Sequence, residues 1–261
     1  MSVNKRAIAK SFSRAATRYD SVAHVQRQVG EAMLSLLEKQ GKYYQNALDI
    51  GCGTGALTRA LSPYADSLTA LDIAPGMLAV AQQRDQDKRI SRFVCGDAER
   101  LPFPSQCFDL VFSSFALQWC DNLFQVVTDI RALLKPQGRF LFSLPVDGTL
   151  CELKQSWAQA EGRHSHVNSF LPVDQVRLAL QQSEFNIVAF QERTDQVFYK
   201  SVRELTRELK TLGAHQVTSN RTPSLTGKQT VLRMTAAYER LRTESGQLPA
   251  SWHYVVVCVE K

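Results

Sequence analysis

The chain lacks the features that mark membrane, secreted and zinc-binding proteins. None of its apolar runs approaches the roughly 20 residues that a membrane-spanning helix requires. The first residues, which include Lys5 and Arg6, have no apolar core of the kind found in secretion signals. The six cysteines form no C-x-x-C pair and no Cys/His cluster at zinc-ligand spacing. We therefore expect a cytoplasmic protein with reduced, buried thiols, no membrane association and no metal site.

What the chain does contain is an ordinary globular composition with an uneven charge. Its 261 residues are 44% hydrophobic, which suits one catalytic domain with an insertion. Residues 1–19 carry five cations and no acid, and residues 200–242 carry nine cations and three acids. The net charge is +6, so these two segments hold +11 and the remainder −5. The pattern indicates either an acidic partner or substrate, or two solvated helix faces.

A short apolar run that leads into three glycines is the strongest functional signal. Residues 47–50 predict a buried strand, and Gly51, Gly53 and Gly55 follow it as G-x-G-x-G. Glycines allow a sharp turn and let a ligand approach bare main chain, and the helix expected next directs unpaired N–H groups at that ligand. Asp49 would repel a pyrophosphate at this place. Its carboxylate suits a ligand with an ammonium and a sulfonium, and S-adenosylmethionine has both.

Two further acids end apolar runs at workable spacing. Asp72 follows the run 68–71, where a carboxylate can bind both ribose hydroxyls, although it can also serve as a helix cap. Asp97 ends the run 93–96 and can accept from an adenine amino group. Met77 lies one turn into the helix expected after Asp72, where it either covers adenine or packs in the core.

With a fourth predicted strand at residues 108–112, these elements resemble the class I S-adenosylmethionine-dependent methyltransferases over residues 45–145. The resemblance implies an α/β, doubly wound, Rossmann-like sheet with S-adenosylmethionine as cofactor. It also implies the cofactor-binding residues, some of which contribute only main chain. These are Asp49, Gly51, Cys52, Gly53, Asp72, Ile73, Met77, Asp97, Ala98 and Ser113. Tyr19, which precedes this region, is expected to join them from the N-terminal flap.

Helical patterns on either side of this region suggest how one catalytic domain is organised. Apolar and cationic residues alternate around a predicted helix at 4–18, whose final Tyr19 either closes over the cofactor or packs as a helix end. We expect four segments: an N-terminal helical flap, the cofactor-binding half, a helical lid and substrate insertion with one strand, and a final strand. Their bounds are 1–40, 41–148, 149–243 and 244–261.

The markers of several methyl-acceptor classes are absent. Residues 113–116 read Ser-Ser-Phe-Ala, and not the Asn/Asp-Pro-Pro-aromatic motif that many amine and nucleic-acid-base methyltransferases carry after the fourth strand. No Pro-Cys pair is present, so the nucleophile that enzymes acting on pyrimidine C5 use is missing. The five histidines occur singly, and such residues more often serve structure or surface than general-base catalysis.

Longer stretches resemble one family in particular. Residues 4–19 (NKRAIAKSFSRAATRY), 117–123, 148–153, 166–172 and 209–214 are similar to the malonyl-acyl-carrier-protein O-methyltransferases of biotin synthesis, and the likeness spans nearly the whole chain. The segment 218–228 matches loosely, which puts contacts there in doubt.

This resemblance implies methylation of the free carboxylate of a malonyl thioester on acyl carrier protein, an acidic partner, to give the methyl ester that primes pimeloyl synthesis. A malonyl carboxylate is already ionised at pH 7, so we expect no general base among the catalytic groups. The residues that the resemblance places near the acceptor are Gln118, Trp119, His166, Asn168, Arg207 and Lys210.

Two other functions remain open on the residues alone. A quinone or other small-molecule C- or O-methyltransferase would share the cofactor half and would need a base. A non-catalytic, RNA-associated cofactor-binding protein would use the basic segments, but aromatic residues would then lie among the cations. Because residues 200–242 contain a single aromatic, Tyr238, we regard nucleic acid as an unlikely partner.

Overall fold

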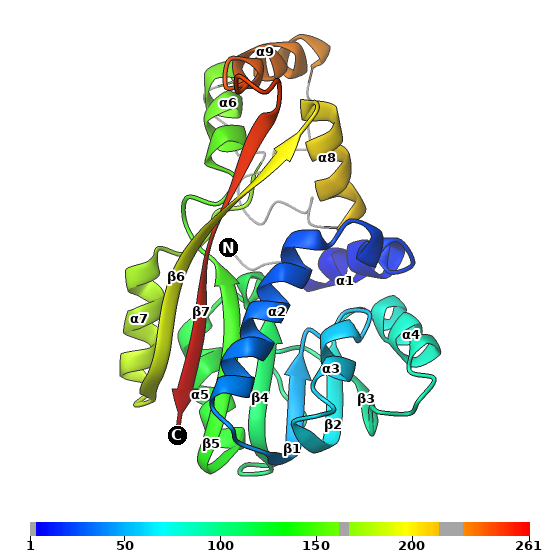
Figure 1. Cartoon of the computed structure of the whole chain (residues 1–261), viewed down its shortest axis with the longest axis vertical. Helices are drawn as coiled ribbons and strands as arrows, with labels where there is room; N and C mark the ends of the chain where they lie inside the picture. Colours follow the sequence, from blue (N-terminus) through cyan, green and yellow to red (C-terminus); the bar gives the residue numbers. More distant parts are fainter. Residues whose placement is uncertain (1–3, 162–166, 214–226) are drawn as a thin grey trace.

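One mixed sheet organises the chain. The computed structural model describes residues 4–161, 167–213 and 227–261. Within them the strand order is β3-β2-β1-β4-β5-β7-β6. The first five strands are parallel, and β7 runs antiparallel between β5 and β6 (Figure 1). The strands are β1 (Tyr44–Ile50), β2 (Ala65–Asp72), β3 (Arg92–Cys95), β4 (Phe108–Ser114), β5 (Leu134–Pro145), β6 (Asn186–Tyr199) and β7 (Leu248–Glu260).

Helices cover both faces of the sheet because its strands alternate two apolar sets of side chains. Ala47 of β1 packs in the cluster that contains α2, whereas Leu48 and Ile50 pack in the cluster that contains α5 and α7. The helices are α1 (Lys5–Ala15), α2 (His24–Lys39), α3 (Ala56–Ala60), α4 (Pro75–Arg84), α5 (Leu123–Leu133), α6 (Cys151–Glu161), α7 (Val173–Gln182), α8 (Val202–Thr211) and α9 (Lys228–Glu239), with 3-10 turns η1 (Tyr19–Ser21) and η2 (Leu117–Trp119).

The strand order reverses beside β1, which lies between β2 and β4. At such a switch point the loops after the two neighbouring strands diverge and leave a crevice at the carboxyl ends. The expected glycine loop follows β1 and therefore borders this crevice. The doubly wound α/β class predicted from the sequence is confirmed.

Helices α6, α8 and α9 form a layer over the crevice, which we call the cover (Figure 1). The long strands β6 and β7 continue past the rest of the sheet and reach α6, α8 and α9 (Figure 1). Helix α1 lies between α8 and α4. The Ser11 hydroxyl donates to the Gly213 carbonyl at 3.0 Å, and the Gly76 N–H donates to the Ser13 hydroxyl at 3.2 Å. Helix α1 is thus tied both to the cover and to the sheet layer.

The segment 149–243 divides between two layers. Helix α7 packs on α5, with Val176 and Leu180 buried against the sheet, and β6 is a sheet strand. Among the helices described in this segment, α6, α8 and α9 stand in the cover (Figure 1). The first predicted helix ends at Ala15, and a 3-10 turn then carries Tyr19. The described part of the chain contains no helix that is long and apolar enough to cross a bilayer.

Candidate active site

Three adjoining cavities occupy the crevice. The glycine-loop cavity, about 310 Å³, lies beside Asp49 and Thr54. The β2–β3 cavity, about 90 Å³, lies between Asp72 and Asp97. The cover cavity, about 380 Å³, lies under α6 and α8. Tyr19 lines all three, so η1 places this side chain where they meet.

The glycine loop requires glycine for conformation and for space. Gly51 has a φ of +74°, and a Cβ there would stand 2.2 Å from the Cβ of Ala116. The Gly51 and Cys52 N–H groups both donate to the Leu71 carbonyl of β2, at 2.8 and 3.0 Å. The Gly53 N–H donates to Asp72 at 2.9 Å. These bonds fix the loop to the neighbouring strand and shape the wall of two cavities.

Asp49 is buried at the end of β1 and faces the glycine-loop cavity. The Thr58 hydroxyl donates to its carboxylate at 2.6 Å. Burial raises the pKa of Asp49 to about 7, the Thr58 hydrogen bond opposes the rise, and the charge of Asp72 adds to it. The ionised carboxylate is therefore poorly solvated, and a bound cation would stabilise it.

Asp72 is the second buried acid, and its side chain accepts two backbone hydrogen bonds. The Ala74 N–H donates to it at 2.7 Å in addition to the Gly53 N–H. Burial nevertheless raises the pKa of Asp72 to about 6. A carboxylate has about four acceptor positions, so acceptor capacity remains for a ligand. The helix-cap role and a ligand role are compatible at this residue.

The β2–β3 cavity is completed by the loop after β3 and by α1. Asp97, Ala98 and Gly96 line one side, and Lys5, Ile8 and Phe12 of α1 line another. Met77 of α4 is buried and also lines this cavity. Met77 packs with Ala16, Ala74 and Val80, and Phe12 and Tyr19 pack against this cluster. The cluster is the surface on which α1 rests. Core packing and cavity lining thus coincide at Met77.

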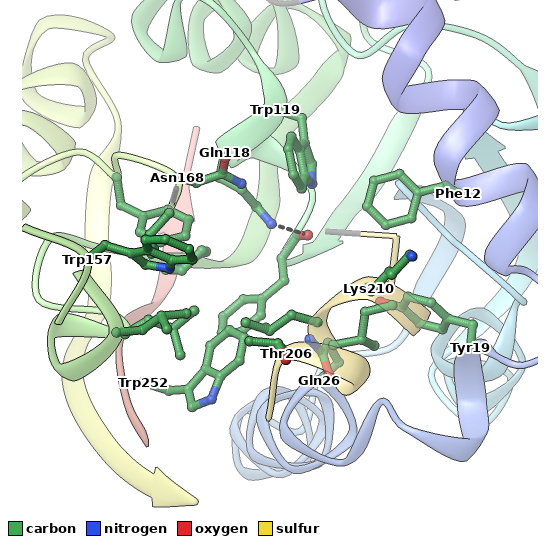
Figure 2. A pocket seen from close by; sticks show the side chains of 18 residues that line it. Phe12, Tyr19, Gln26, Gln118, Trp119, Trp157, Asn168, Thr206, Lys210 and Trp252 are labelled. Carbon is green, nitrogen blue, oxygen red and sulfur yellow. Dashed lines mark hydrogen bonds between the residues drawn. The ribbon is translucent and has the colours of Figure 1, made fainter. Parts of the chain in front are cut away.

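The cover cavity is aromatic and carries a single charge. All three tryptophans of the chain, Trp119, Trp157 and Trp252, line it. Figure 2 shows Lys210 on the same side as Tyr19 and Phe12. Among the described lining residues, Lys210 is the one charged side chain, and none is His, Asp or Glu. The described walls of this cavity therefore suit an anionic or neutral acceptor.

Two glutamines lie at the borders of the cover cavity. The Gln118 amide donates to the Phe115 carbonyl at 2.6 Å (dashed in Figure 2), and its oxygen has no partner among the described residues. Gln26 lines both the cover cavity and the glycine-loop cavity, and its buried amide oxygen likewise has no described partner. Polar groups left unpaired in a cavity wall are poised for a ligand.

Most residues predicted from the sequence meet at these cavities, including Ile73, Cys52, Trp119 and Asn168. Ser113 does not: its hydroxyl donates to the Ile50 carbonyl at 2.9 Å inside the sheet. Strand residues alternate between faces, and Ser114, one place further, lines the cavities instead. Arg207 is exposed on α8 and lines none of the three, and His166 lies outside the described residues.

Several lining residues were not predicted from the sequence, among them Lys5, Phe12, Gln26, Phe115, Trp157 and Trp252. Trp157 and Trp252 lie on α6 and β7, far from the glycine loop in the chain. No local motif marks them, so only the packing of the cover reveals them. Lys5 and Phe12 lie at helical spacing within the predicted flap. That spacing was the one sequence signal that could have pointed to these two residues.

Comparisons with known proteins agree with this geometry. Residues 48–142 match the methyltransferase domain family. A solved structure of a putative methyltransferase from Bacillus halodurans superposes with a TM-score of 0.63 at 16% identity, covering 88% of this chain and 98% of that one. The fold and the glycine-loop site thus define a class I methyltransferase, a class that uses S-adenosylmethionine.

Full-length relatives narrow the class. Malonyl-[acyl-carrier protein] O-methyltransferase of Serratia marcescens is 38% identical over 251 residues, 96% of this chain and 94% of that protein. The biotin biosynthesis bifunctional protein BioHC of Cellvibrio japonicus is 42% identical over 258 residues, 98% of this chain and 50% of that protein. The chain therefore spans about half the length of such bifunctional relatives. It belongs to the malonyl-[acyl-carrier protein] O-methyltransferase family.

Proposed function

We propose that this chain transfers a methyl group from S-adenosylmethionine to the free carboxylate of a malonyl thioester carried on acyl carrier protein. One observation carries the proposal. The cover cavity meets the glycine-loop cavity at Tyr19 and Gln26, and the only charge among its described lining residues is the cation Lys210. Such a cavity attracts an anionic acceptor to the place where the cofactor cavities open.

The cofactor cavities have the groups that S-adenosylmethionine requires. Asp49 faces the methionine ammonium, and its buried carboxylate gains a cationic partner. Asp72 accepts from the ribose hydroxyls, and the main chain of Gly51 and Gly53 allows close approach. Asp97 accepts from the adenine amino group, and Ala98 offers its N–H to the ring edge.

Tyr19 closes the junction without acting as a base. Burial raises the pKa of its hydroxyl, and the charges of Asp72 and Asp20 raise it further, so the phenol stays neutral. Asp20 fastens η1 to the glycine loop, because the Thr54 hydroxyl donates to Asp20 at 2.7 Å and Arg84 forms an ion pair with it. The neutral ring separates the cofactor from water.

The reaction requires orientation and dehydration. A carboxylate oxygen of the acceptor forms a bond to the methyl carbon as the carbon–sulfur bond breaks, and no proton moves. Anion and sulfonium become neutral products, so a cavity from which water is excluded favours the step. Lys210, at the rim, orients the carboxylate, and the aromatic walls exclude water.

An exposed cationic surface lies beside the cover cavity. Arg203, Arg207 and Lys210 share one face of α8, and Arg6, Lys10 and Arg14 form a stripe on α1. None of the six forms an ion pair with another described residue. The Ser11–Gly213 hydrogen bond holds the two helices together. We assign this surface to the acidic carrier protein, because complementary charge steers such encounters.

The test is a label-transfer assay. The protein receives methyl-labelled S-adenosylmethionine with malonyl carrier protein, malonyl-CoA or RNA in separate reactions, and label is expected on the malonyl carboxylate. The double variant Arg203→Glu, Arg207→Glu changes two exposed cations of α8 that line none of the three cavities, and it should lose far more activity on malonyl carrier protein than on malonyl-CoA. The matched control is Lys39→Glu, at an exposed cation that is the last residue of α2. It should leave both activities unchanged.

Two results would count against these assignments. Label on RNA alone would replace the proposed acceptor. Equal loss on both thioesters in the double variant would place the two cations in the acceptor pocket or in the fold, and not in the carrier-protein surface.

A further inference from the structure

Lys5, in the first turn of α1, lies against the acids after β3. Its Nζ is 2.6 Å from Glu99 Oε2 and 3.4 Å from Asp97 Oδ1, and it donates to the Trp119 carbonyl at 3.0 Å. Asp97 and Glu99 belong to the loop after β3 and Trp119 ends η2, and Lys5, Asp97 and Trp119 line the β2–β3 cavity together. Cations of the α1 stripe, such as Lys10, form no such contacts with the described residues.

Glu99 is the centre of this arrangement. Its Oε1 accepts from the Asp121 N–H at 2.9 Å and from the Asn122 N–H at 3.2 Å, at the start of α5, while its Oε2 pairs with Lys5. Its own N–H donates to Asp97 Oδ1 at 3.0 Å. One carboxylate oxygen of Asp97 is thus engaged by the Glu99 N–H and by Lys5. Its other oxygen, Oδ2, has no partner among the described residues.

Electrostatics explains why a cation is needed here. The side chains of Asp97 and Glu99 are only 27% and 21% exposed, so water screens their mutual repulsion poorly. Burial alone would lower the pKa of Lys5, but the Glu99 hydrogen bond, with the charges of Cys120, Asp97 and Glu99, gives a net rise. Lys5 therefore stays charged, and it holds both acids in one arrangement.

We infer that Lys5 is a positioning residue for adenine recognition: it fixes Asp97 Oδ1 through the Glu99 network, so that Oδ2 is presented to the adenine amino group. The inference rests on the proposed function, because it uses the Asp97–adenine contact assigned there. It predicts that Lys5 governs discrimination between adenine and a base that lacks the amino group, and not merely overall affinity.

The experiment compares binding of S-adenosylhomocysteine and S-inosylhomocysteine, in which an oxo group replaces the adenine amino group, by calorimetry. Lys5→Met keeps the apolar stem and removes the charge. The preference for the adenine ligand should fall by about tenfold, the usual scale of one charge-assisted contact. Lys5→Arg should restore part of it. Lys39→Met, at an exposed lysine of α2 that lines none of the three cavities, should leave both affinities unchanged.

The outcomes separate the inference from its premise. If Lys5→Met weakens both ligands equally, Lys5 only anchors α1 and the inference is overturned. Tighter binding would also overturn it, because Lys5 would then be obstructing the cavity. Asp97→Asn tests the premise: unchanged discrimination in that variant refutes the proposed cofactor orientation. A loss there, with none in Lys5→Met, refutes the role of Lys5 alone. Thermal unfolding confirms that each variant is folded.

Discussion

Cofactor affinity should depend on pH through the two buried acids of the glycine-loop region. Asp49 has a pKa of about 7 and Asp72 of about 6 in the free protein, both because of burial. A ligand ammonium and ribose hydroxyls stabilise the ionised forms, so binding lowers both pKa values. The affinity for the cofactor is therefore highest above pH 7, and it falls as the pH drops through the pKa values of Asp49 and Asp72.

The magnitude follows from the fraction of each acid that is ionised. Between pH 8 and pH 6, a pKa of about 7 for Asp49 gives about tenfold weaker binding, and a pKa of about 6 for Asp72 gives about a further twofold. Near pH 7, binding should release about half a proton from Asp49. Calorimetry with S-adenosylhomocysteine, in buffers of different ionisation enthalpy, measures both the change in affinity and the number of protons released.

Asp49→Asn is the decisive variant. It should bind the ligand weakly, remove the tenfold pH effect and leave only the twofold effect of Asp72. The folded pKa of Asp49 exceeds its unfolded value of 3.8, so the free protein loses stability as the pH rises from about 4 to 7. The loss is on the order of 4 kcal/mol at most. The ligand-free variant should therefore have a higher Tm at pH 8. Constant affinity from pH 6 to 8 in the unaltered protein would refute this reasoning.

Other expectations follow from the same geometry. Asp72→Ala should weaken cofactor binding by about 2–4 kcal/mol in calorimetry, because a charge-assisted pair of hydrogen bonds is lost. Single-turnover rates at saturating cofactor should stay nearly flat from about pH 6 to 8, also in His166→Asn, because the acceptor is already an anion; a pKa near 6.5 that vanishes in the variant would favour a hydroxyl or carbon acceptor. Gly76→Ala should cost about 1–3 kcal/mol in denaturant unfolding and weaken cofactor binding, because its Cβ would stand 2.7 Å from the Ser13 backbone.

The structure brings the glycine loop, Asp72 and Asp97 to adjoining cavities, as the local patterns predict, for a physical reason. The glycine loop, Asp72 and Asp97 each follow a strand directly, and the carboxyl ends of parallel strands meet at one edge. Sequence order alone therefore brings these residues together. Ser113 shows the limit of this logic: at a strand end, a shift of one residue moves a side chain from the cavity into the sheet.

The acceptor side could not be predicted in the same way. Trp157 and Trp252 reach the cover cavity from α6 and β7, and their meeting depends on how far β6 and β7 extend beyond the sheet. The sequence predicts a helical lid and substrate insertion with one strand over residues 149–243, and within that segment α7 packs on α5. The pattern of apolar residues in α7 defines a buried face, but it does not specify which layer covers that face.

The cofactor side of the crevice contains buried acids, whereas the described acceptor side contains a cation. Asp49 and Asp72 make the cofactor side negative, and both are buried without a cationic side chain paired to them among the described residues. Lys210 makes the acceptor side positive. Each side thus attracts the reactant of opposite charge, and the neutral ring of Tyr19 stands between them. Methyl transfer removes the malonyl carboxylate charge, so Lys210 loses its electrostatic attraction to the ester product and release of that product is favoured. The ammonium of S-adenosylhomocysteine remains charged, so Asp49 continues to hold the cofactor product.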